Sequence, residues 1–202
     1  MMFEFRPVDP VADAPLLHSW MSRDYAHFWG MGSASLDEVR REYAGIDANP
    51  HHEAWLGLHG DAPAFLMESY APAHSPLAAL YPVQPGDRGM HLLMSPPDNP
   101  RHGFTFAAFR AVMDFLFSAP QAGQAPQAGQ APQAGQAPQP QRIVVEPDVR
   151  NSKIHVLNQR LGFQPHSRIE LPDKTALLSF CTRQQFLAAT AGTRMTYEGA
   201  KR

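Results

Sequence analysis

The chain has 202 residues, of which 44% are hydrophobic, and a formal net charge of −2 at pH 7. This length and apolar content suit the core of one domain, so we expect a single domain over residues 1–202. The balanced charge provides no basic surface for nucleic acid, and no apolar run approaches the ~20 residues that span a membrane. The composition therefore favours a protein that acts on small molecules, without nucleic-acid or membrane partners.

The N-terminus and the cysteine content indicate the cellular compartment. The first residues, MMFEFRPVDP, lack the charged and apolar regions of a secretory signal. The one cysteine, Cys181, lies in the apolar run ALLSFC, where we expect a buried structural thiol and no internal disulfide. These features predict a cytoplasmic protein, and they leave the oligomeric state open between a monomer and a weak dimer.

Hydrophobic patterning predicts helices and strands in a mixed α/β order. A strand and two helices come first, followed by a hairpin whose turn, HGDAP, contains Gly60 and Asp61. A central strand, a helix, a buried strand, another helix and two closing strands complete the order. The expected strands are 3–6, 54–58, 64–70, 89–95, 143–146, 168–170 and 176–181, and the expected helices are 12–22, 36–43, 104–117 and 151–161.

The segment 119–141 differs from the rest of the chain in composition. QAGQAP occurs three times between Gln121 and Pro138, and this stretch contains no charged or aromatic residue. Such a segment cannot bury enough apolar surface to offset the entropy of ordering it. We therefore predict a disordered loop inserted between a helix and a strand of the same domain.

The segment 142–163, RIVVEPDVRNSKIHVLNQRLGF, predicts a strand, a polar turn and a helix in direct succession. The β-branched run at 143–145 fits a buried strand, which should end before Pro147 because proline donates no ladder hydrogen bond. Asp148 and Asn151 can cap the helix that follows, and Gly162 is a natural stop.

This order resembles the late strand-to-helix segment of the GCN5-related N-acetyltransferase (GNAT) fold, where an asparagine in the turn and a "GF" after the helix recur. The stretch 86–109, GDRGMHLLMSPPDNPRHGFTFAAF, resembles the central strand and coenzyme A loop of the same fold. With HSWM…FWGM at 18–31 and LPDKTALL at 171–178, these motifs are similar to siderophore-biosynthesis hydroxylamine acyltransferases, most of all to those of the alcaligin pathway. The resemblance spans roughly residues 5–186, apart from the inserted segment 119–141.

The resemblance implies an α/β (more strictly α+β) fold with a central, mixed and mostly antiparallel sheet flanked by helices. It also implies an acyl-coenzyme A N-acyltransferase that uses acetyl- or succinyl-coenzyme A as co-substrate. The acceptor would be the N-hydroxylated end of a diamine, such as N-hydroxyputrescine, or of lysine, and the product a hydroxamate used in iron acquisition. Because no G-x-S-x-G or similar nucleophile motif is present, we expect direct attack on the thioester.

Two other functions remain open at this point. A GNAT protein of this kind could acetylate an ordinary amine of a metabolite, an antibiotic or a protein. The departures from the family's coenzyme A loop also fit a non-catalytic member that binds a ligand or partner.

His91 and Asp148 are the candidate catalytic residues. An ordinary imidazole titrates near ~6.5, so His91 could accept a proton at neutral pH, and the resemblance places the histidine of "HLL" at the acyl-transfer centre. Asp148 would orient His91 or bind the substrate, although helix capping explains it equally simply. Which of the two acts as base is left open.

The candidate coenzyme A residues lie mainly at the start of the helix 104–117. Free backbone N–H groups and the helix dipole favour phosphate there, and Gly103 would allow close approach. The match is partial, because Pro100 takes the first place of the family pattern and Thr105 the last, and an ordinary turn is the alternative. The residues assigned to coenzyme A are Arg101, His102, Gly103, Phe104 and Thr105, with Leu93 (backbone N–H to the thioester carbonyl) and Asn151 (pantetheine) by resemblance alone.

The candidate acceptor-binding residues are His18, Trp20, Trp29 and Asp173. In the resembled fold, the N-terminal helices form one wall of the acceptor groove, although core packing would also explain aromatic residues there. Asp173, with its neighbour Lys174, could touch the acceptor or form a plain turn. The other histidines lack the spacing of a zinc site, so no metal is expected.

Overall fold

The structure, a computed structural model, describes residues 1–96, 100–118 and 140–198, with side chains to residue 191. The predicted loop 119–141 lies outside the described residues except for its last two positions. The strands are β1 (Glu4–Pro7), β2 (His52–His59), β3 (Ala62–Tyr70), β4 (Asp87–Met94), β5 (Arg142–Val145), β6 (Gln164–Glu170) and β7 (Thr175–Thr182). The helices are α1 (Ala14–Met21), α2 (Leu36–Asp47), α3 (Phe104–Ser118), α4 (Ser152–Arg160) and α5 (Arg183–Glu198), with short 3-10 turns η1 (Asp24–Trp29), η2 (Pro72–His74) and η3 (Pro76–Ala79).

The strands form one sheet in the order β1-β2-β3-β4-β5-β7-β6. All neighbouring pairs are antiparallel except β4 and β5, which are parallel. The prediction of a mixed, mostly antiparallel sheet flanked by helices is confirmed.

The parallel pair separates halfway along β4. The last paired residues are Gly89 and Val144, whereas β4 continues to Met94 and stays paired with β3 as far as that residue. The two strands therefore open a gap in the middle of the sheet, and the functional site lies there.

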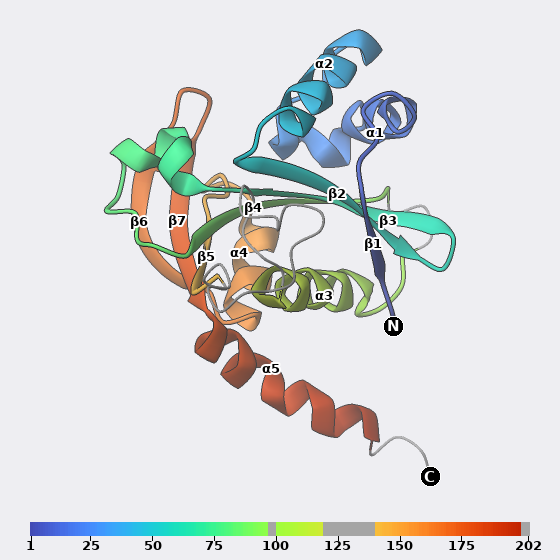
Figure 1. The fold of residues 1–202 in the computed structure, drawn as a ribbon. Helices are drawn as coiled ribbons and strands as arrows, with labels where there is room; N and C mark the ends of the chain where they lie inside the picture. Colours follow the sequence, from blue (N-terminus) through green and yellow to red (C-terminus); the bar gives the residue numbers. More distant parts are fainter. Residues whose placement is uncertain (97–99, 119–139, 199–202) are drawn as a thin grey trace, which may run out of the picture.

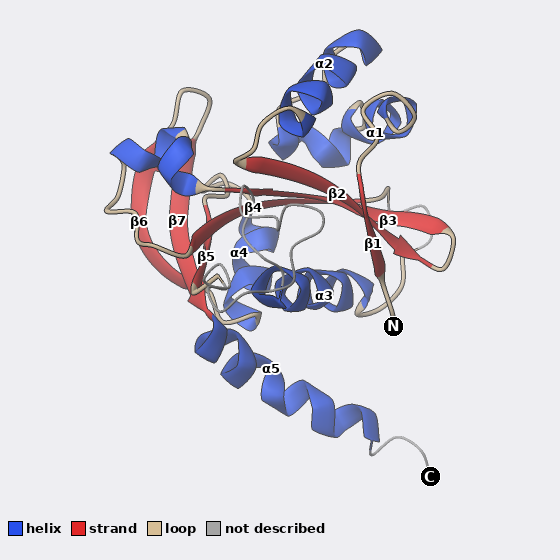
Figure 2. Ribbon diagram, in the orientation of Figure 1, coloured by secondary structure: helices blue, strands red, loops and turns tan. Residues whose placement is uncertain are grey.

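Helices cover both faces of the sheet, with α1 and α2 on one side and α3 and α4 on the other (Figures 1 and 2). Alternate residues of β3 face opposite cores, because successive side chains of a strand point to opposite faces. Leu66 packs with the core beneath α1 and α2, and Phe65 and Met67 pack with the core beneath α3. Cys181 is free and buried in the second of these cores, as expected.

The helix α5 was not predicted, although its start has a recognisable signal. The Thr182 backbone N–H donates to the Gln185 side chain at 2.8 Å, and the Gln185 N–H donates back to the Thr182 hydroxyl at 3.3 Å. This reciprocal pair is the T-x-x-Q form of a capping box. The helix extends away from the sheet (Figure 1). Little of its sequence therefore shows a periodic apolar pattern from which a helix could have been predicted.

Candidate active site

A cavity of about 810 Å³ occupies the gap between β4 and β5. Its wall also includes parts of three connecting segments, 25–31, 74–77 and 171–174. Six of the predicted site residues line it: Trp29, His91, Leu93, Asp148, Asn151 and Asp173. Segments that are far apart in the sequence thus meet around one space.

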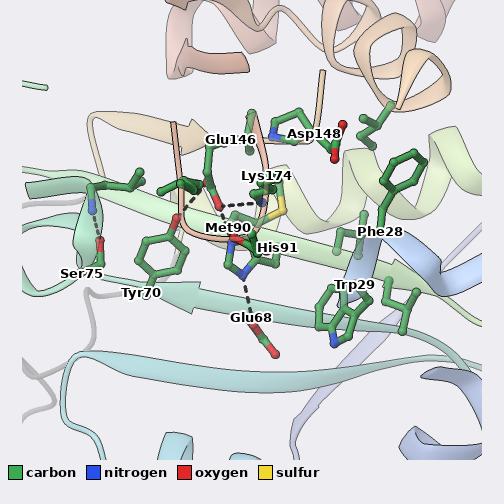
Figure 3. Close-up of a pocket in the computed structure, with 18 of the residues that line it drawn as sticks. Phe28, Trp29, Glu68, Tyr70, Ser75, Met90, His91, Glu146, Asp148 and Lys174 are labelled. Atoms are coloured by element: carbon green, nitrogen blue, oxygen red, sulfur yellow. Dashed lines mark hydrogen bonds and ion pairs between the residues drawn. The ribbon is translucent and has the colours of Figure 1, made fainter. Parts of the chain in front are cut away.

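His91 stands between two carboxylates in this cavity (Figure 3). Its Nδ1 lies 3.1 Å from Glu68 Oε2, and its Nε2 lies 2.6 Å from Glu146 Oε1. The His91 side chain is 38% exposed, whereas those of Glu68 and Glu146 are 9% and 5% exposed. The imidazole is therefore the most exposed part of this cluster, and the two carboxylates lie deeper.

The other polar contacts of the two carboxylates are also satisfied. The Tyr43 hydroxyl donates to Glu68 Oε1 at 2.8 Å, and the Tyr70 hydroxyl donates to Glu146 Oε2 at 3.0 Å. Two longer contacts complete the cluster. His52 Nε2 is 3.7 Å from Glu68, and Lys174 Nζ is 3.8 Å from Glu146.

These contacts set the charge of the cluster. Burial by itself lowers the pKa of His91, but the charges and hydrogen bonds of Glu146 and Glu68 outweigh it and raise the pKa to about 10. Burial raises the pKa of Glu68, but its polar neighbours His52, His91 and Tyr43 hold it at about 2. The pKa of Glu146 is lowered as well, against burial and chiefly by His91. At neutral pH the cluster is an imidazolium between two carboxylates.

The register of β3 and β4 explains how the cluster assembles. Glu68 and His91 are direct cross-strand partners, and Tyr70 is the partner of Gly89. A Cβ at Gly89 would lie 2.2 Å from the Tyr70 ring. Only glycine therefore lets the ring lie flat against β4, from which its hydroxyl reaches Glu146, the residue after β5.

Asp148 lines the cavity but pairs with a different residue from the one expected. Arg150 Nε and Nη2 donate to its two carboxylate oxygens at 2.9 and 2.6 Å, and the Arg150 hydrogen bonds lower the pKa of Asp148 to about 2. Among the residues that the structure describes, the ring nitrogens of His91 meet Glu68 and Glu146 instead. The predicted pairing of Asp148 with His91 is thus replaced by one with Glu146.

Asn151 is the N-cap of α4, and its side chain accepts a hydrogen bond from the Ile154 N–H at 3.3 Å. Capping by Asn151 is therefore confirmed, and its contact with pantetheine stays a prediction. Leu93 is buried on β4 and lines the cavity, and its cross-strand partner on β3 is Leu66.

The predicted coenzyme A loop lies at the N-terminus of α3 and contributes none of Arg101 to Thr105 to the cavity wall as described. Gly103 is exposed and has a φ of 75°, and a Cβ placed on it would meet no atom of the described residues within 4 Å. The first N–H groups of a helix have no intrahelical partner. This combination fits an anionic group such as a pyrophosphate.

The four predicted acceptor residues divide into two groups. The Trp29 ring lies 6.2 Å from the His91 ring, edge to face, and Asp173 belongs to the turn 171–174 that carries Lys174. Trp20 is buried in the core beneath α1 and α2, and His18 lies 3.4 Å from the Ser22 hydroxyl on its own helix. Neither Trp20 nor His18 is in the described wall of the cavity.

Sequence reasoning missed Glu68, Glu146 and Tyr70. The available signal was a single carboxylate inside each of two apolar runs, AFLMESY and RIVVEP. A charge in such a run is rarely buried without a partner, so each glutamate pointed to a cation facing it.

No group of three or more potential metal-binding side chains is present in the described part of the chain. The same residues contain no helix that is both long and apolar enough to cross a membrane.

The sequence matches the acetyltransferase (GNAT) domain family over residues 9–125 and 132–171. The mixed seven-stranded sheet agrees with this family match. The chain belongs to the GNAT family of acyl-coenzyme A-dependent N-acyltransferases.

Two curated relatives match most of the chain. N(6)-hydroxylysine O-acetyltransferase of Escherichia coli is 25% identical over 92% of this chain and 53% of its own length, so the chain spans about half of that protein. N-hydroxyputrescine acetyltransferase of Acinetobacter baumannii is 23% identical over 91% of this chain and 79% of its own length.

Solved structures share the fold over nearly the whole chain. An uncharacterized protein from Bacillus halodurans has a TM-score of 0.79 and 28% identity, covering 96% of this chain and 91% of that one. The aminoglycoside acetyltransferase AAC(6')-Ib, in complex with acetyl-coenzyme A, has a TM-score of 0.74 and 20% identity, covering 92% and 96%.

Proposed function

We propose that the protein transfers an acetyl or succinyl group from coenzyme A to the N-hydroxylated end of a diamine or of lysine. The product would be a hydroxamate for siderophore biosynthesis, in the manner of the alcaligin-pathway branch of the family. The observation that carries this proposal is the position of His91 between Glu68 and Glu146 in the cavity, at 3.1 and 2.6 Å, where the two carboxylates favour the imidazolium form of the ring.

An imidazolium cannot take a proton from an incoming ammonium group. A primary alkyl amine resembles lysine, whose pKa is about 10.4, so at neutral pH almost all of it is protonated and lacks a free lone pair. The electron-withdrawing hydroxyl of an N-hydroxyamine lowers its basicity. The site therefore favours a nucleophile that arrives neutral, which an N-hydroxyamine does and a plain amine does not.

The charge of the cavity wall supports an acceptor with a cation at its far end. Among the described residues, five carboxylates line the cavity and Lys174 is the one lysine or arginine. The carboxylates are Glu42, Glu68, Glu146, Asp148 and Asp173. Both a diamine and lysine carry an ammonium group distant from the hydroxylamine, and such a group is attracted to an acidic wall.

In this proposal the two substrates approach the gap between β4 and β5 from different sides. Coenzyme A would bring its pyrophosphate to Arg101, His102, Gly103, Phe104 and Thr105, its pantetheine arm past Asn151, and its thioester carbonyl to the Leu93 N–H. The acceptor would lie against Trp29, Asp148 and Asp173. Attack would take place directly in a complex of all three.

The names of the curated relatives support the hydroxylamine acceptor, because both contain a hydroxylated amine. The second candidate function is acetylation of an ordinary amine. The observation that favours it is the fold shared with an aminoglycoside acetyltransferase. A site built to hydrogen-bond the acceptor hydroxyl would discriminate against the parent amine by ~10⁴ or more.

The test is free thiol release from acetyl- and succinyl-coenzyme A with matched acceptor pairs. These are N-hydroxyputrescine, N-hydroxycadaverine and N6-hydroxylysine, each beside its unhydroxylated parent. We expect kcat/KM to be at least about 10²-fold higher for the hydroxylated member of a pair. Equal or higher kcat/KM for the parent amines would refute the siderophore function and leave the ordinary-amine one.

A further inference from the structure

Both ring nitrogens of His91 are already occupied. Nδ1 faces Glu68 on β3 and Nε2 faces Glu146 just after β5 (Figure 3), so neither nitrogen presents a lone pair to the cavity. A ring in this position cannot receive a proton from a bound acceptor unless a carboxylate first gives way. The open acceptor sites in the cluster are on the carboxylates themselves.

The two carboxylates differ in where they lie relative to the gap. Glu68 lies on β3, which stays paired with β4 from Tyr70 to Phe65, and the Tyr43 hydroxyl from α2 holds its far oxygen. Glu146 follows the end of β5, beyond the last pair that joins β5 to β4. Glu146 therefore borders the open gap, whereas Glu68 supports His91 from the closed side.

Oε2 of Glu146 keeps a lone pair beyond its protein contact. Oε1 meets His91 at 2.6 Å and Lys174 at 3.8 Å, whereas Oε2, among the described residues, accepts from Tyr70 alone, at 3.0 Å. A carboxylate oxygen has two acceptor positions, so a further N–H can be accommodated.

We propose that Glu68 is a positioning residue that keeps His91 as an imidazolium throughout turnover, so that a Glu146 oxygen, and not the ring, takes the proton of the attacking nitrogen. This inference rests on the proposed acyl transfer. The nitrogen lone pair forms the C–N bond while the carbonyl π electrons move to oxygen, and the N–H proton passes to Glu146. The carbonyl then re-forms, the C–S bond breaks, and the proton returns to the departing thiolate, which balances the reaction without another reactant.

The test compares two variants at each pH. Glu68→Gln keeps the shape of the side chain but removes one of the two charges that hold the proton on His91. Tyr43→Phe removes the hydrogen bond to the same carboxylate and leaves its charge in place. The other titratable groups around the ring (His52, Tyr70, Glu146, Asp148 and Lys174) are unchanged in both.

The measured quantity is the ratio of variant to wild-type kcat from pH 6.5 to 9, with whichever acceptor the wild type uses best. Loss of one carboxylate moves the pKa of His91 down towards its ordinary value, so the Glu68→Gln ratio should fall about tenfold or more across this range. The Tyr43→Phe ratio should stay level. A Glu68→Gln ratio that is level or rises with pH would show that the neutral ring does the work, and an equal fall in Tyr43→Phe would show a packing effect. Either result overturns the proposal.

A second measurement does not depend on turnover. The NMR signals of the His91 ring in the wild-type protein should show no titration between pH 6 and 8.5, whereas those of Glu68→Gln should titrate within this range. Titration of wild-type His91 near pH 7 would overturn the proposal even if Glu68→Gln does not fold. The choice of acceptor is judged separately from the matched pairs above, because the kcat ratio and the NMR titration are unaffected by whether a hydroxylamine or an amine is preferred.

Discussion

The gap between β4 and β5 and the N-terminus of α3 are built on opposite principles. In the gap, buried side chains hold one another, and His91 is fixed by two carboxylates that are themselves held by tyrosines. At the start of α3, the side chains of Arg101 and His102 are exposed, and the backbone at Gly103 is the open feature. The proposed function thus assigns side-chain chemistry to the first region and backbone recognition to the second. Substitutions should separate kcat from the KM for acyl-coenzyme A accordingly.

The largest effect should follow His91→Ala. This change removes the cation that lies between Glu68 and Glu146, and we expect kcat to fall by about 10² to 10⁴ with little change in the KM for acyl-coenzyme A. Steady-state thiol release measures both constants. The matched control is His166→Ala, an exposed histidine of β6, which should keep kcat within about threefold of wild type. If the His91→Ala enzyme is as active as this control, the gap between β4 and β5 is not where acyl transfer takes place.

The next effect should follow Gly103→Ala, and it should have the opposite kinetic signature. An added Cβ at φ 75° meets no atom of the described residues within 4 Å but would crowd the backbone to which the proposal assigns the phosphates, so we expect the KM for acyl-coenzyme A to rise about tenfold at unchanged kcat. Gly60→Ala introduces the same kind of strain at φ 61° in the turn between β2 and β3. If both variants raise the KM equally, general strain is the cause and the loop loses its assignment.

The same comparison shows what the sequence could and could not predict. The start of α3 at Phe104 and the place of His91 on a central strand were predictable, because a glycine before an apolar helical run and a histidine in a strand are local features. The partner of His91 was not. Asp148 and Glu146 are two residues apart, and which of them reaches the ring depends on where β5 ends and how far it diverges from β4. No local pattern encodes that divergence.

Burial also hid part of the site. Glu68 and Tyr70 sit in a strand that reads as core, and their role depends on the cross-strand register with His91 and Gly89. Trp20 shows the opposite error. This residue of α1 was predicted to bind the acceptor, but its side chain is buried in the core beneath α1 and α2. Which residues pair across strands, and which face of a helix is buried, are tertiary properties that the local sequence does not determine.

A smaller effect should appear in the pH dependence of stability. The pKa of Glu68, about 2 in the folded protein, lies below its ordinary value, so its stabilising contribution is present above about pH 4.5 and is lost as the pH falls towards 2. The pKa of His91, about 10, lies above its ordinary value, so its contribution is present below about pH 6.5 and is lost as the pH rises towards 10. Both describe one interaction, which is therefore strongest between about pH 4.5 and 6.5.

Thermal unfolding between pH 5.5 and 9.5 should accordingly show a drop in Tm that is smaller in His91→Gln than in the wild type. Each kcal/mol of lost stability corresponds to about 2–4 °C in a chain of this size. His166→Gln, with the same substitution on the exposed strand β6, should retain the wild-type slope. Parallel curves for the wild type and His91→Gln would mean that the ion pairs of the gap add nothing to the folded state.

The smallest effect should come from replacing residues 121–139 by a short Gly/Ser linker. The helix α3 has 15 residues, which corresponds to about 22 Å, so Ser118 lies a full helix length from Gly103 and the open backbone there. At the other end, β5 is secured independently of the preceding segment, because the Gln141 N–H donates to the Gly86 carbonyl at 3.0 Å and Arg142 forms a two-point ion pair with Asp87. The shortened protein should therefore keep kcat and both KM values within about twofold. A tenfold loss of kcat/KM in a protein whose Tm is unchanged would show that the repeat takes part in substrate binding. The site would then consist of three regions: the gap, the N-terminus of α3 and the repeat.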